Sequence, residues 1–305
     1  MQEEYELIQY PLIPYLNVFI NRIIYRRPHR HDETEFCVCL EGNSKWQILG
    51  QLYDVSPGDF LILNPNTLHE IKGEEKGSTF IFVQFSYEIF NAIFPEIKNL
   101  IFDQSVVGEN KDILKTSLIE FSKQYFVSSQ KDFFKVLSGL FALFDKVLHN
   151  VSHHYMNLKE QTSYNFKMER ISRLVDFVEK NFKQNITLSD FAINEGISLA
   201  YASRFIKENL NMTFQDYVKE LRFNEAKKLM LLKNKSLSTI SFEAGFSDPR
   251  YLKEVFEEKL AMSPSEYRKD NFIPGDSEQK YNPLNSEHIF TRQESAVLLN
   301  NKLSF

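Results

Sequence analysis

Two stretches near the C-terminus, LSDFAINEGISLAYASRFIKENLNMTFQDY (188–217) and LSTISFEAGFSDPRYLKEVFEEKLAMSPSEY (237–267), resemble one another and decide the fold of this half of the chain. They align at an offset of 49 residues, which becomes 50 after one inserted residue that follows the glycine. Each stretch has the pattern of a helix-turn-helix, in which a short turn containing glycine joins two helices. Two such units in tandem favour a nucleic-acid-binding domain over a bundle of helices that only pack against each other.

Side chains suited to capping mark the start of each predicted helix. In the first unit Thr187 and Asp190 have the spacing of a capping box, and Ser198 stands where the second helix begins. In the second unit we expect Ser236 and Ser247 to cap the two corresponding helices. The matching caps indicate that both units have the same local structure.

The turns and the connection between the units follow from the same alignment. Gly196 and Gly245 permit the tight turn inside each unit. Thr213 and Ser263 begin one further helix after each unit, the latter with proline at the favoured first position. Residues 214–232 are expected to form one long helix that connects the two units.

Helical periodicity predicts which face of each second helix is exposed. The apolar residues expected to face inward are Ala202, Phe205, Ile206, Leu210, Leu252, Val255, Phe256 and Leu260. The residues expected on the outward faces are Ala200, Ser203, Arg204 and Lys207 in the first unit and Pro249, Arg250, Lys253 and Glu254 in the second. These outward faces are the candidate contact surfaces.

The segment EAGFSDPRYLKEVFEEKLAMSPSEYR (243–268) resembles the signature of AraC-type transcription regulators, and the similarity extends over residues 168–268. The resemblance implies that the two second helices enter successive major-groove turns on one face of DNA, about 34 Å apart. Carried over by position, the family's base-contacting residues would be Ala200, Ser203, Arg204, Arg250, Lys253 and Glu254, and we add Ser198, Lys207 and Ser247 to the predicted DNA-binding set. Arg204 and Arg250 suit bidentate contact with guanine, whereas Lys207 and Lys253 suit phosphate.

The second unit departs from the family pattern at one position. Glu254 stands where the family usually has a basic residue, and Glu257 and Glu258 follow it. A carboxylate can accept a hydrogen bond from cytosine N4, but it repels phosphate. We therefore expect the first unit to contribute more DNA affinity than the second.

Composition and charge permit this interpretation without establishing it. The chain has 305 residues, of which 43% are hydrophobic, and its net charge is −5, which suits about two globular domains. Residues 165–270 carry 18 Lys and Arg against 16 Asp and Glu, whereas the remainder carries 18 against 25. No segment approaches the ~18 apolar residues of a membrane span, and the N-terminus lacks the pattern of a secretory signal, so we expect a cytoplasmic protein.

The N-terminal part has the pattern of short strands. Between Leu16 and Ser86 the runs NVFINRIIY, EFCVCL, KWQIL, DFLIL and STFIFVQF alternate with the turn sequences GNS, SPGD, NPNT and GEEKG. Closely spaced strands without intervening helices predict an antiparallel barrel or jelly roll. The AraC resemblance likewise implies a cupin-like sensing barrel, for which we expect the bounds 1–110.

A helical segment is expected at 111–150, where apolar residues recur at helical spacing. Its stripe comprises Phe133, Phe134, Val136, Leu137, Leu140, Phe141, Phe144, Val147 and Leu148. The stripe needs a partner surface, which is either the outside of the barrel or the same helix of a second subunit, and we assign this segment to dimerisation. Residues 151–167 are polar and aperiodic and are predicted to be a linker to the DNA-binding domain at 168–268. Residues 269–305 form a C-terminal extension, expected to be mostly flexible, with an apolar patch at 296–299 that can dock as a short helix.

The stretch HRHDETEFCVCLEG (29–42) matches the first cupin motif, and NPNTLH (64–69) resembles a degraded second motif with Asn66 where glycine is usual. His29, His31 and Glu35 are separated by even numbers of residues, so in an extended segment their side chains can point to the same face, into the barrel. His69 could complete a set of three histidines and one glutamate, which would suit iron, manganese or nickel.

Four roles are open for these residues: structural hydrogen bonding, direct contact with a small ligand such as a sugar, metal binding, and catalysis as in a cupin oxygenase. We predict an effector pocket, formed by His29, His31, Glu35, Cys37, Trp46 and His69, with no catalytic residue, metal or cofactor. Trp46 can stack on a sugar ring or serve as plain core. Cys37 and Cys39 are expected to stay reduced, because they are two residues apart on one strand face.

The sequence therefore predicts an α+β protein of two domains, with an N-terminal antiparallel cupin-like barrel followed by helices and a C-terminal all-α double helix-turn-helix. Its expected function is that of a ligand-responsive transcription regulator, active as a homodimer that binds double-stranded DNA and recruits RNA polymerase as an activator. The expected effector is a small molecule, with a sugar as the first candidate. The alternative is a metal-dependent cupin enzyme that uses His29, His31, Glu35 and His69.

Overall fold

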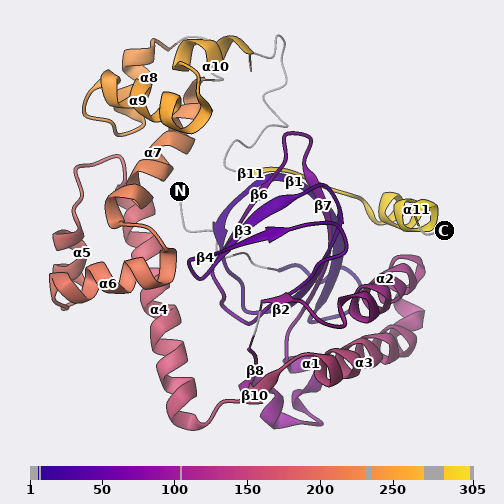
Figure 1. Ribbon diagram of the computed structural model, residues 1–305. Helices are drawn as coiled ribbons and strands as arrows, with labels where there is room; N and C mark the ends of the chain where they lie inside the picture. The colour runs from indigo at the N-terminus through magenta and orange to yellow at the C-terminus, as the bar shows by residue number, and fades with distance from the viewer. Residues whose placement is uncertain (1–5, 7, 104, 231–234, 271–284, 303–305) are drawn as a thin grey trace. The chain divides into compact units, whose positions relative to one another are not determined.

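The computed structural model describes residues 6, 8–103, 105–230, 235–270 and 285–302 (Figure 1). The chain divides into two compact units. Of the described residues, the barrel unit comprises those within 4–48, 52–169 and 287–302, and the helical unit comprises those within 170–286 together with 49–51. None of the described helices is long and apolar enough to cross a membrane.

The barrel unit is built on one curled sheet (Figure 1) with the strand order β4-β3-β6-β1-β7-β2-β5-β9, and β11 pairs with β1 outside this path. The pairs β1–β6, β1–β7, β2–β5, β2–β7 and β3–β6 are all antiparallel, which confirms the predicted antiparallel barrel. The strands are β1 (Leu16–His29), β2 (Thr34–Glu41), β3 (Ser44–Ile48), β4 (Gln51–Val55), β5 (Phe60–Leu63), β6 (His69–Gly73), β7 (Ser78–Phe85), β9 (Val106–Val107) and β11 (Asn285–Ile289). The sequence did not reveal β4 and β6, because neither strand has a run of apolar residues.

Side chains that alternate along the central strands form two separate clusters of buried apolar residues. On β2, Phe36 and Val38 belong to a cluster that includes residues of α2 (Lys111–Val127) and α3 (Phe133–Asn150). Cys37 and Cys39, on the opposite face of β2, join Trp46 in a second cluster of residues from the strands. Because consecutive strand residues point to opposite faces, one cluster lies outside the sheet and the other inside it.

The apolar stripe of α3 packs mainly on the outside of the barrel. Val136, Leu140 and Phe144 are buried in the outer cluster, with Phe144 stacked on Phe36 at 6.2 Å between ring centroids. Phe134, at the start of the helix, remains 82% exposed. Thus the surface of the barrel covers most of the stripe. The remaining short elements of the barrel unit are α1 (Glu88–Asn91), η1 (Pro95–Asn99), β8 (Leu100–Phe102) and η2 (Gln130–Asp132).

The expectation that residues 151–167 lack regular structure is wrong, whereas their assignment as a linker between the domains stays a prediction. Residues His153–Tyr155 form β10, which pairs antiparallel with β8, and α4 (Leu158–Asn181) begins immediately afterwards. Asn157 starts this helix: its side chain accepts from the backbone N–H of Glu160 at 3.0 Å, and the Glu160 carboxylate accepts from the N–H of Asn157 at 2.9 Å. The first turns of α4 lack an apolar period because they are largely exposed, so the pattern gave no sign of a helix.

The prediction of a mostly flexible C-terminal extension is also wrong for the described residues 285–302. They form β11 and α11 (Arg292–Lys302), and Leu299 of the predicted apolar patch is fully buried in the outer cluster of the barrel unit. The patch therefore docks through a helix. Residues 271–284 and 303–305 of the extension lie outside the described residues.

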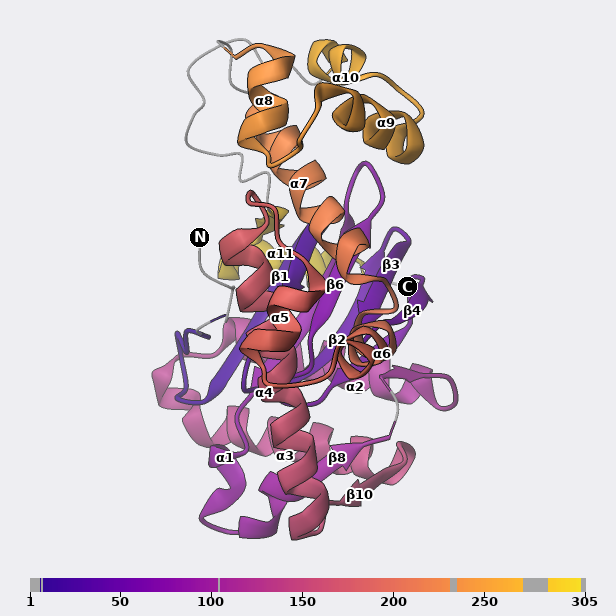
Figure 2. The same cartoon turned by 90° about the vertical axis from the view of Figure 1, so that its left-hand side faces the viewer.

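The helical unit contains the two predicted helix-turn-helix units (Figure 2). Its helices after α4 are α5 (Leu188–Asn194), α6 (Leu199–Leu210), α7 (Phe214–Met230), α8 (Leu237–Glu243), α9 (Pro249–Leu260) and α10 (Pro264–Asp270). The connecting helix expected at 214–232 is described to Met230, and the last two residues lie outside the described part. All eight inward positions predicted for α6 and α9 are buried except Leu260, which is half-buried.

Three of the four predicted helix caps are confirmed, and the fourth is wrong. The side chains of Thr187, Ser198 and Ser236 each accept a hydrogen bond from the backbone N–H three residues on. At α9 the cap is Asp248, which accepts from the N–H of Arg250 at 2.7 Å, and Ser247 lies outside the helix. The inserted residue of the second unit precedes the cap, so the offset of 50 applies already at Asp248, and Pro249 occupies the first helical position.

Candidate functional site

The outward faces of α6 and α9 are polar and accessible. Ala200, Ser203, Arg204 and Lys207 are all exposed on α6, and Ser198 is exposed at its start. On α9, Arg250, Lys253 and Glu254 are exposed, Pro249 is half-buried, and Ser247 is exposed before the helix. The structure therefore places every predicted DNA-contacting residue at or beside the free face of its helix.

The cations on the two faces differ in their surroundings. Arg250 folds back on the Asp248 carboxylate, with Nε and Nη2 at 3.1 and 2.8 Å from Oδ2, and its guanidinium lowers the pKa of Asp248. Lys253 Nζ lies 3.6 Å from Glu257 Oε1. Within the described residues no ion pair involves Arg204 or Lys207; the Arg204 guanidinium instead lies 5.7 Å from the centroid of the Tyr201 ring. The cations of α6 are therefore available to an anionic partner without breaking an ion pair.

A buried carboxylate, which sequence reasoning missed, fixes the first unit on α4. Glu195 precedes the turn glycine and accepts from Arg173 at 2.7 and 3.0 Å and from Arg170 at 3.4 Å. Hydrogen bonds from Arg173 are the main reason why the pKa of Glu195 is lowered, and burial opposes the shift only in part. Arg170 also donates to the Tyr201 hydroxyl of α6 at 3.0 Å. No spacing rule connects residues 22 and 25 positions apart, so only the fold could reveal this cluster.

The turn of the second unit packs against the end of α4. Gly245 has φ of +95°, and a Cβ at this position would lie 2.7 Å from Lys183 Cα and 2.9 Å from the Phe182 carbonyl oxygen. Arg222 of α7 donates to the carbonyl oxygens of Phe182 and Gln184 at 2.7 and 2.8 Å. These contacts set the position of α8 and α9 relative to the end of α4.

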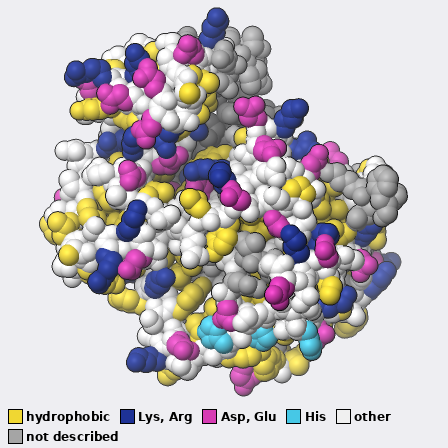
Figure 3. All heavy atoms as spheres, viewed as in Figure 1, with side chains coloured by type: hydrophobic (Ala, Val, Ile, Leu, Met, Phe, Trp, Pro, Cys, Tyr) yellow, Lys and Arg dark blue, Asp and Glu magenta, His cyan; other side chains and the backbone are white. Residues whose placement is uncertain are grey.

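Charge on the visible surface of the molecule is mixed. Figure 3 shows lysine and arginine side chains interspersed with aspartate and glutamate, without one continuous basic patch on this face. The distribution agrees with the small charge difference between the two parts of the sequence. Such a surface would favour a polyanionic partner through a few well-placed cations more than through total charge.

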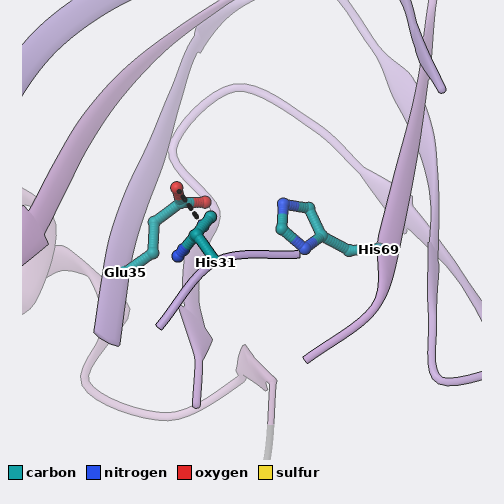
Figure 4. Close-up of side chains that lie close together, drawn as sticks. All are labelled: His31, Glu35 and His69. Carbon is teal, nitrogen blue, oxygen red and sulfur yellow. Dashed lines mark ion pairs between the residues drawn. The ribbon is translucent and has the colours of Figure 1, made fainter. Parts of the chain in front are cut away.

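The second candidate site is a cluster of histidines inside the barrel. His29 of β1 is directly paired with His69 of β6, and their ring centroids are 4.0 Å apart. His31 lies between β1 and β2, and its Nε2 is 3.3 Å from Oε2 of Glu35 on β2 (Figure 4). All four side chains are at most 4% exposed, so the cluster is closed to solvent.

Each histidine is oriented by a backbone carbonyl. The Nδ1 atoms of His29, His31 and His69 lie 2.9, 3.1 and 2.9 Å from the carbonyl oxygens of Arg27, Glu33 and Thr67. Since a carbonyl only accepts, each Nδ1 carries the proton, and in a neutral ring Nε2 then keeps its lone pair. The Nε2 atoms of His31 and His69 and Oε1 of Glu35 are buried without a hydrogen-bond partner. Gln84 of β7, which the sequence did not single out, donates to the other oxygen of Glu35 at 2.8 Å.

Burial and neighbouring charges give the ionisable side chains of the cluster different protonation states. Burial lowers the pKa of His69 to about 4 and moves that of His29 well below its usual range. For His31 burial also favours the neutral ring, but the carboxylates of Glu35, Glu6 and Glu33 together outweigh it and raise the pKa. At Glu35 burial favours the neutral acid, but His31 together with His69 and Gln84 outweighs it and lowers the pKa of that carboxyl. The cluster therefore holds two neutral imidazoles beside an ion pair.

Three of the four predicted ligand residues come together as a possible metal site. One ligand atom each from His31, Glu35 and His69 lies within 4.8 Å of the others. The structure does not bring His29 into this group, because its Nε2 lies near Glu6, 3.7 Å from Oε2. Two imidazoles and a carboxylate suit a divalent first-row metal, and the histidines have the outer hydrogen bonds that metal ligands usually make.

Trp46 and Cys37 form the apolar side of this cluster. The Trp46 ring is fully buried and stacks against His69 at 6.1 Å between centroids, and its Nε1 donates to Ser44 Oγ at 3.1 Å. Burial raises the pKa of the Cys37 thiol well above its usual range, so the thiol stays protonated and unreactive. Both residues belong to the apolar cluster inside the sheet.

Comparison with known proteins gives two family matches. Residues 21–100 match the profile of the AraC-like ligand binding domain, and residues 191–270 match that of a helix-turn-helix domain. The chain is 24% identical over 279 residues to the HTH-type transcriptional regulator YdeC of Bacillus subtilis, covering 88% of this chain and 95% of the relative. It is 23% identical over 250 residues to the HTH-type transcriptional activator RhaS of Mannheimia succiniciproducens, covering 79% and 88%. It is also 30% identical over 100 residues to the lactose operon transcription activator of Staphylococcus xylosus, covering 33% and 36%.

Proposed function

We propose, because this chain belongs to the AraC family of transcription regulators, that it reads an asymmetric DNA site through α6 and α9 and activates neighbouring genes in response to a small molecule. The observation that carries the proposal is the tandem of two capped helix-turn-helix units, each with a polar and exposed second helix. We expect such a regulator to act in the cytoplasm, where the DNA is.

The proposed DNA contacts are made by Ser198, Ala200, Ser203, Arg204, Lys207, Ser247, Arg250, Lys253 and Glu254. We expect base contacts from Arg204 and Arg250, since a guanidinium can bind O6 and N7 of guanine together. The first unit supplies more of the affinity, because Arg250 and Lys253 must leave carboxylates before they reach DNA. In contrast, Arg204 and Lys207 enter the complex without that cost.

Enrichment of genomic DNA fragments on the purified protein tests this function. We expect one asymmetric motif spanning about two helical turns, and the genes beside it would indicate the effector. The variant in which Arg204 and Lys207 are both alanine should enrich no motif, whereas Glu208→Ala, an exposed change on the same helix, should leave the motif intact. If the unchanged protein enriches no sequence even at low salt, the proposed function is wrong.

The effector is proposed to bind at the cluster of His29, His31, Glu35, Cys37, Trp46 and His69. Convergent polar atoms without partners beside an aromatic wall are typical of a site that orients a polar ligand. A sugar is the first candidate, since one relative is the activator of a lactose operon. Since the cluster is closed to solvent, binding requires the barrel to open, which would shift the balance between DNA-competent and incompetent states. We assign the barrel to binding rather than catalysis, because the family is one of regulators.

A panel of mono- and disaccharides tests this assignment through the melting temperature of the protein and the fluorescence of Trp46, its single tryptophan. A cognate sugar at about 100 times its Kd should stabilise the barrel unit by about 2.7 kcal/mol. The response should disappear in His69→Ala and persist in His149→Ala, whose histidine is exposed on α3. A response that persists in His69→Ala would place the ligand elsewhere.

A bound divalent metal is the second candidate for the same cluster, favoured by the three ligand atoms within 4.8 Å of one another and by Nε2 of His31, Nε2 of His69 and Oε1 of Glu35, which are buried without a hydrogen-bond partner. Metal binding would require His31 to lose the proton of its ion pair with Glu35. His31, Glu35 and His69 would hold the ion, and a metal would supply a Lewis-acidic centre that can bind an oxygen-rich ligand. Elemental analysis of protein purified without chelators distinguishes the candidates. One equivalent of iron, manganese or nickel, lost in His69→Ala and kept in His149→Ala, would favour the metal, and a metal-free protein that binds a sugar would exclude it.

We further propose that the protein acts as a homodimer and recruits RNA polymerase when bound to DNA. The dimer contact is assigned to α2 and α3, where Phe133, Phe134 and Phe141 keep exposed fractions of 38, 82 and 38%. Recruitment is tested by transcription in vitro from a template that carries the enriched motif, with purified polymerase. An increase in transcript that needs both the motif and Arg204 would support activation, whereas a decrease would indicate a repressor.

A further inference from the structure

The chain returns to the barrel unit after the helical unit has ended. Residues 287–305 belong with the barrel, so the barrel unit flanks the helical unit on both sides in sequence. Within this return, β11 pairs with β1, and α11 packs against α2 and β1 (Figure 1). We call residues 285–302, which comprise β11 and α11, the strap.

The first attachment of the strap is made through β1. The N–H of Phe290 donates to the carbonyl oxygen of Ile20 at 2.9 Å, and the Glu287 carboxylate accepts from Asn21 at 2.7 Å and from Arg26 at 3.0 Å. Arg26 is only 6% exposed. A cation at this depth needs an anionic partner, so Glu287 satisfies a charge that the barrel would otherwise bury with fewer partners.

The second attachment is made at the end of α2. Arg292 donates to the carbonyl oxygens of Tyr125 and Phe126 at 2.6 and 3.0 Å and also to that of Ser128. The last turn of α2 contains no basic residue of its own, so Arg292 supplies the cation that favours a helix C-terminus. Leu299, fully buried on α11, completes the outer core beside it.

The first attachment is linked to the histidine cluster by charged side chains. Arg26 Nη2 lies 3.0 Å from Oε2 of Glu6, and the same oxygen lies 3.7 Å from Nε2 of His29. The His29 ring is in turn 4.0 Å from that of His69. Contacts therefore run from the cluster through Glu6 and Arg26 to Glu287, and a ligand that displaces His29 or Glu6 would change the partners of Arg26.

We propose that the strap is a second, releasable tether of the DNA-binding domain, and that the histidine cluster controls its release through Glu6 and Arg26. With the strap docked, the helical unit is joined to the barrel unit at both ends, and its reach is restricted. With the strap released, the helical unit is joined to the barrel unit through α4 alone. Its helices α6 and α9 can then bind paired DNA sites that are separated by more varied distances. The effect on spacing rests on the proposed DNA binding and dimer, and the control by the cluster rests on the proposed effector site, whereas the docking of the strap rests on neither.

Hydrogen exchange of the full-length protein tests the docking. The amides of β11 and α11 should be protected in the unchanged protein and should exchange about tenfold faster or more in Glu287→Ala and Arg292→Ala, because each removes charged hydrogen bonds. Gln293→Ala, an exposed neighbour of Arg292, is the matched control and should retain full protection. A strap that exchanges at the rate of an unstructured peptide in the unchanged protein would refute the tether.

The link to the cluster is tested by Glu6→Gln. We expect faster exchange at β11 in this variant, with no change in Glu96→Gln, an exposed glutamate of η1. Equal exchange at β11 in both variants would refute control by the cluster.

For the effect on DNA, the Glu287→Ala and Arg292→Ala variants should bind paired sites of altered spacing better than the unchanged protein does. Unaltered spacing preference would refute the restriction, whereas absence of any DNA binding would refute the proposed function and leave the exchange results standing.

Discussion

Gly245, in the turn of the second helix-turn-helix unit, lies against the backbone of Lys183, so that a Cβ on Gly245 would come within 2.7 Å of Lys183 Cα. The corresponding Gly196 of the first unit has no such neighbour within 4 Å. Two glycines that the repeat makes equivalent in sequence are therefore needed for different reasons. At position 245 glycine is required both by the nearby backbone of Lys183 and by the positive φ, whereas at position 196 it is required by the positive φ alone.

This difference predicts unequal effects of alanine at the two glycines. Gly196→Ala should reduce the free energy of unfolding by about 1 to 2 kcal/mol, the usual cost of a left-handed alanine. Gly245→Ala should cost several kcal/mol, because the backbone near Lys183 must also move. Urea unfolding followed by circular dichroism measures both values, and equal losses would contradict the packing described here.

The arginines on the two proposed DNA-contacting faces should contribute unequally to DNA binding. Arg204→Ala should weaken binding of the enriched site by about 1–3 kcal/mol, roughly 10- to 100-fold, and Arg250→Ala should weaken it less. The reason is that Arg250 gives up its bidentate contact with Asp248 on binding. Titration of labelled DNA at fixed salt measures both affinities. Equal losses, or a larger loss for Arg250→Ala, would reverse the ranking of the two units.

The Glu195 cluster predicts a dependence of stability on pH. Because Arg173 and Arg170 lower the pKa of Glu195 below its usual 4.5, the stabilisation is present above that value and is lost as the pH falls through the folded pKa. Glu195→Gln should therefore destabilise the helical unit by about 1–3 kcal/mol at pH 7, and the difference from the unchanged protein should shrink in acid. Thermal unfolding between pH 7 and pH 3 tests this. A constant difference across that range would show that charge is not the cause.

A stabilising change is predicted at the end of α9. Ala261 caps this helix with a φ of 52°, whereas the corresponding Asn211 of α6 has a φ of 53°. Alanine is strained in the left-handed region, and asparagine tolerates it better. Ala261→Gly should raise the free energy of unfolding by about 1 kcal/mol, and Asn211→Gly should change it by less. Denaturant midpoints compare the two directly, and a loss of stability in Ala261→Gly would exclude strain at this position.

The proposed dimer predicts an effect of charge on α3. Phe134→Asp should shift the protein from dimer to monomer in analytical ultracentrifugation, because an aspartate would be buried in the proposed contact. The barrel should stay folded, since Phe134 is 82% exposed. Lys131→Asp, an exposed change before the same helix, serves as the control for added negative charge. A folded Phe134→Asp dimer would move the contact away from this end of α3.

The helical unit could be predicted in unusual detail because its structure is local. Turn glycines, caps and apolar spacing all lie within one or two helical turns of the residues that they organise, and Thr187 with Asp190 is an example. The one wrong cap, Ser247, arose from a single inserted residue. The barrel was predictable only as a class, because pairing partners such as His29 and His69 are 40 residues apart.

The sequence by itself determined that the chain contains two helix-turn-helix units with exposed polar faces. It also determined that the chain contains an antiparallel barrel in which His29, His31 and Glu35 can share one strand face. Only the tertiary structure decided that His29 faces Glu6 and leaves a three-residue cluster, that Glu195 holds α4, and that the C-terminal residues return to the barrel. The physical reason is that periodicity and capping depend on neighbours along the chain, whereas these ion pairs join residues up to 261 positions apart, as in Arg26 and Glu287. Such contacts form only where the folded backbone brings their charges together and excludes water.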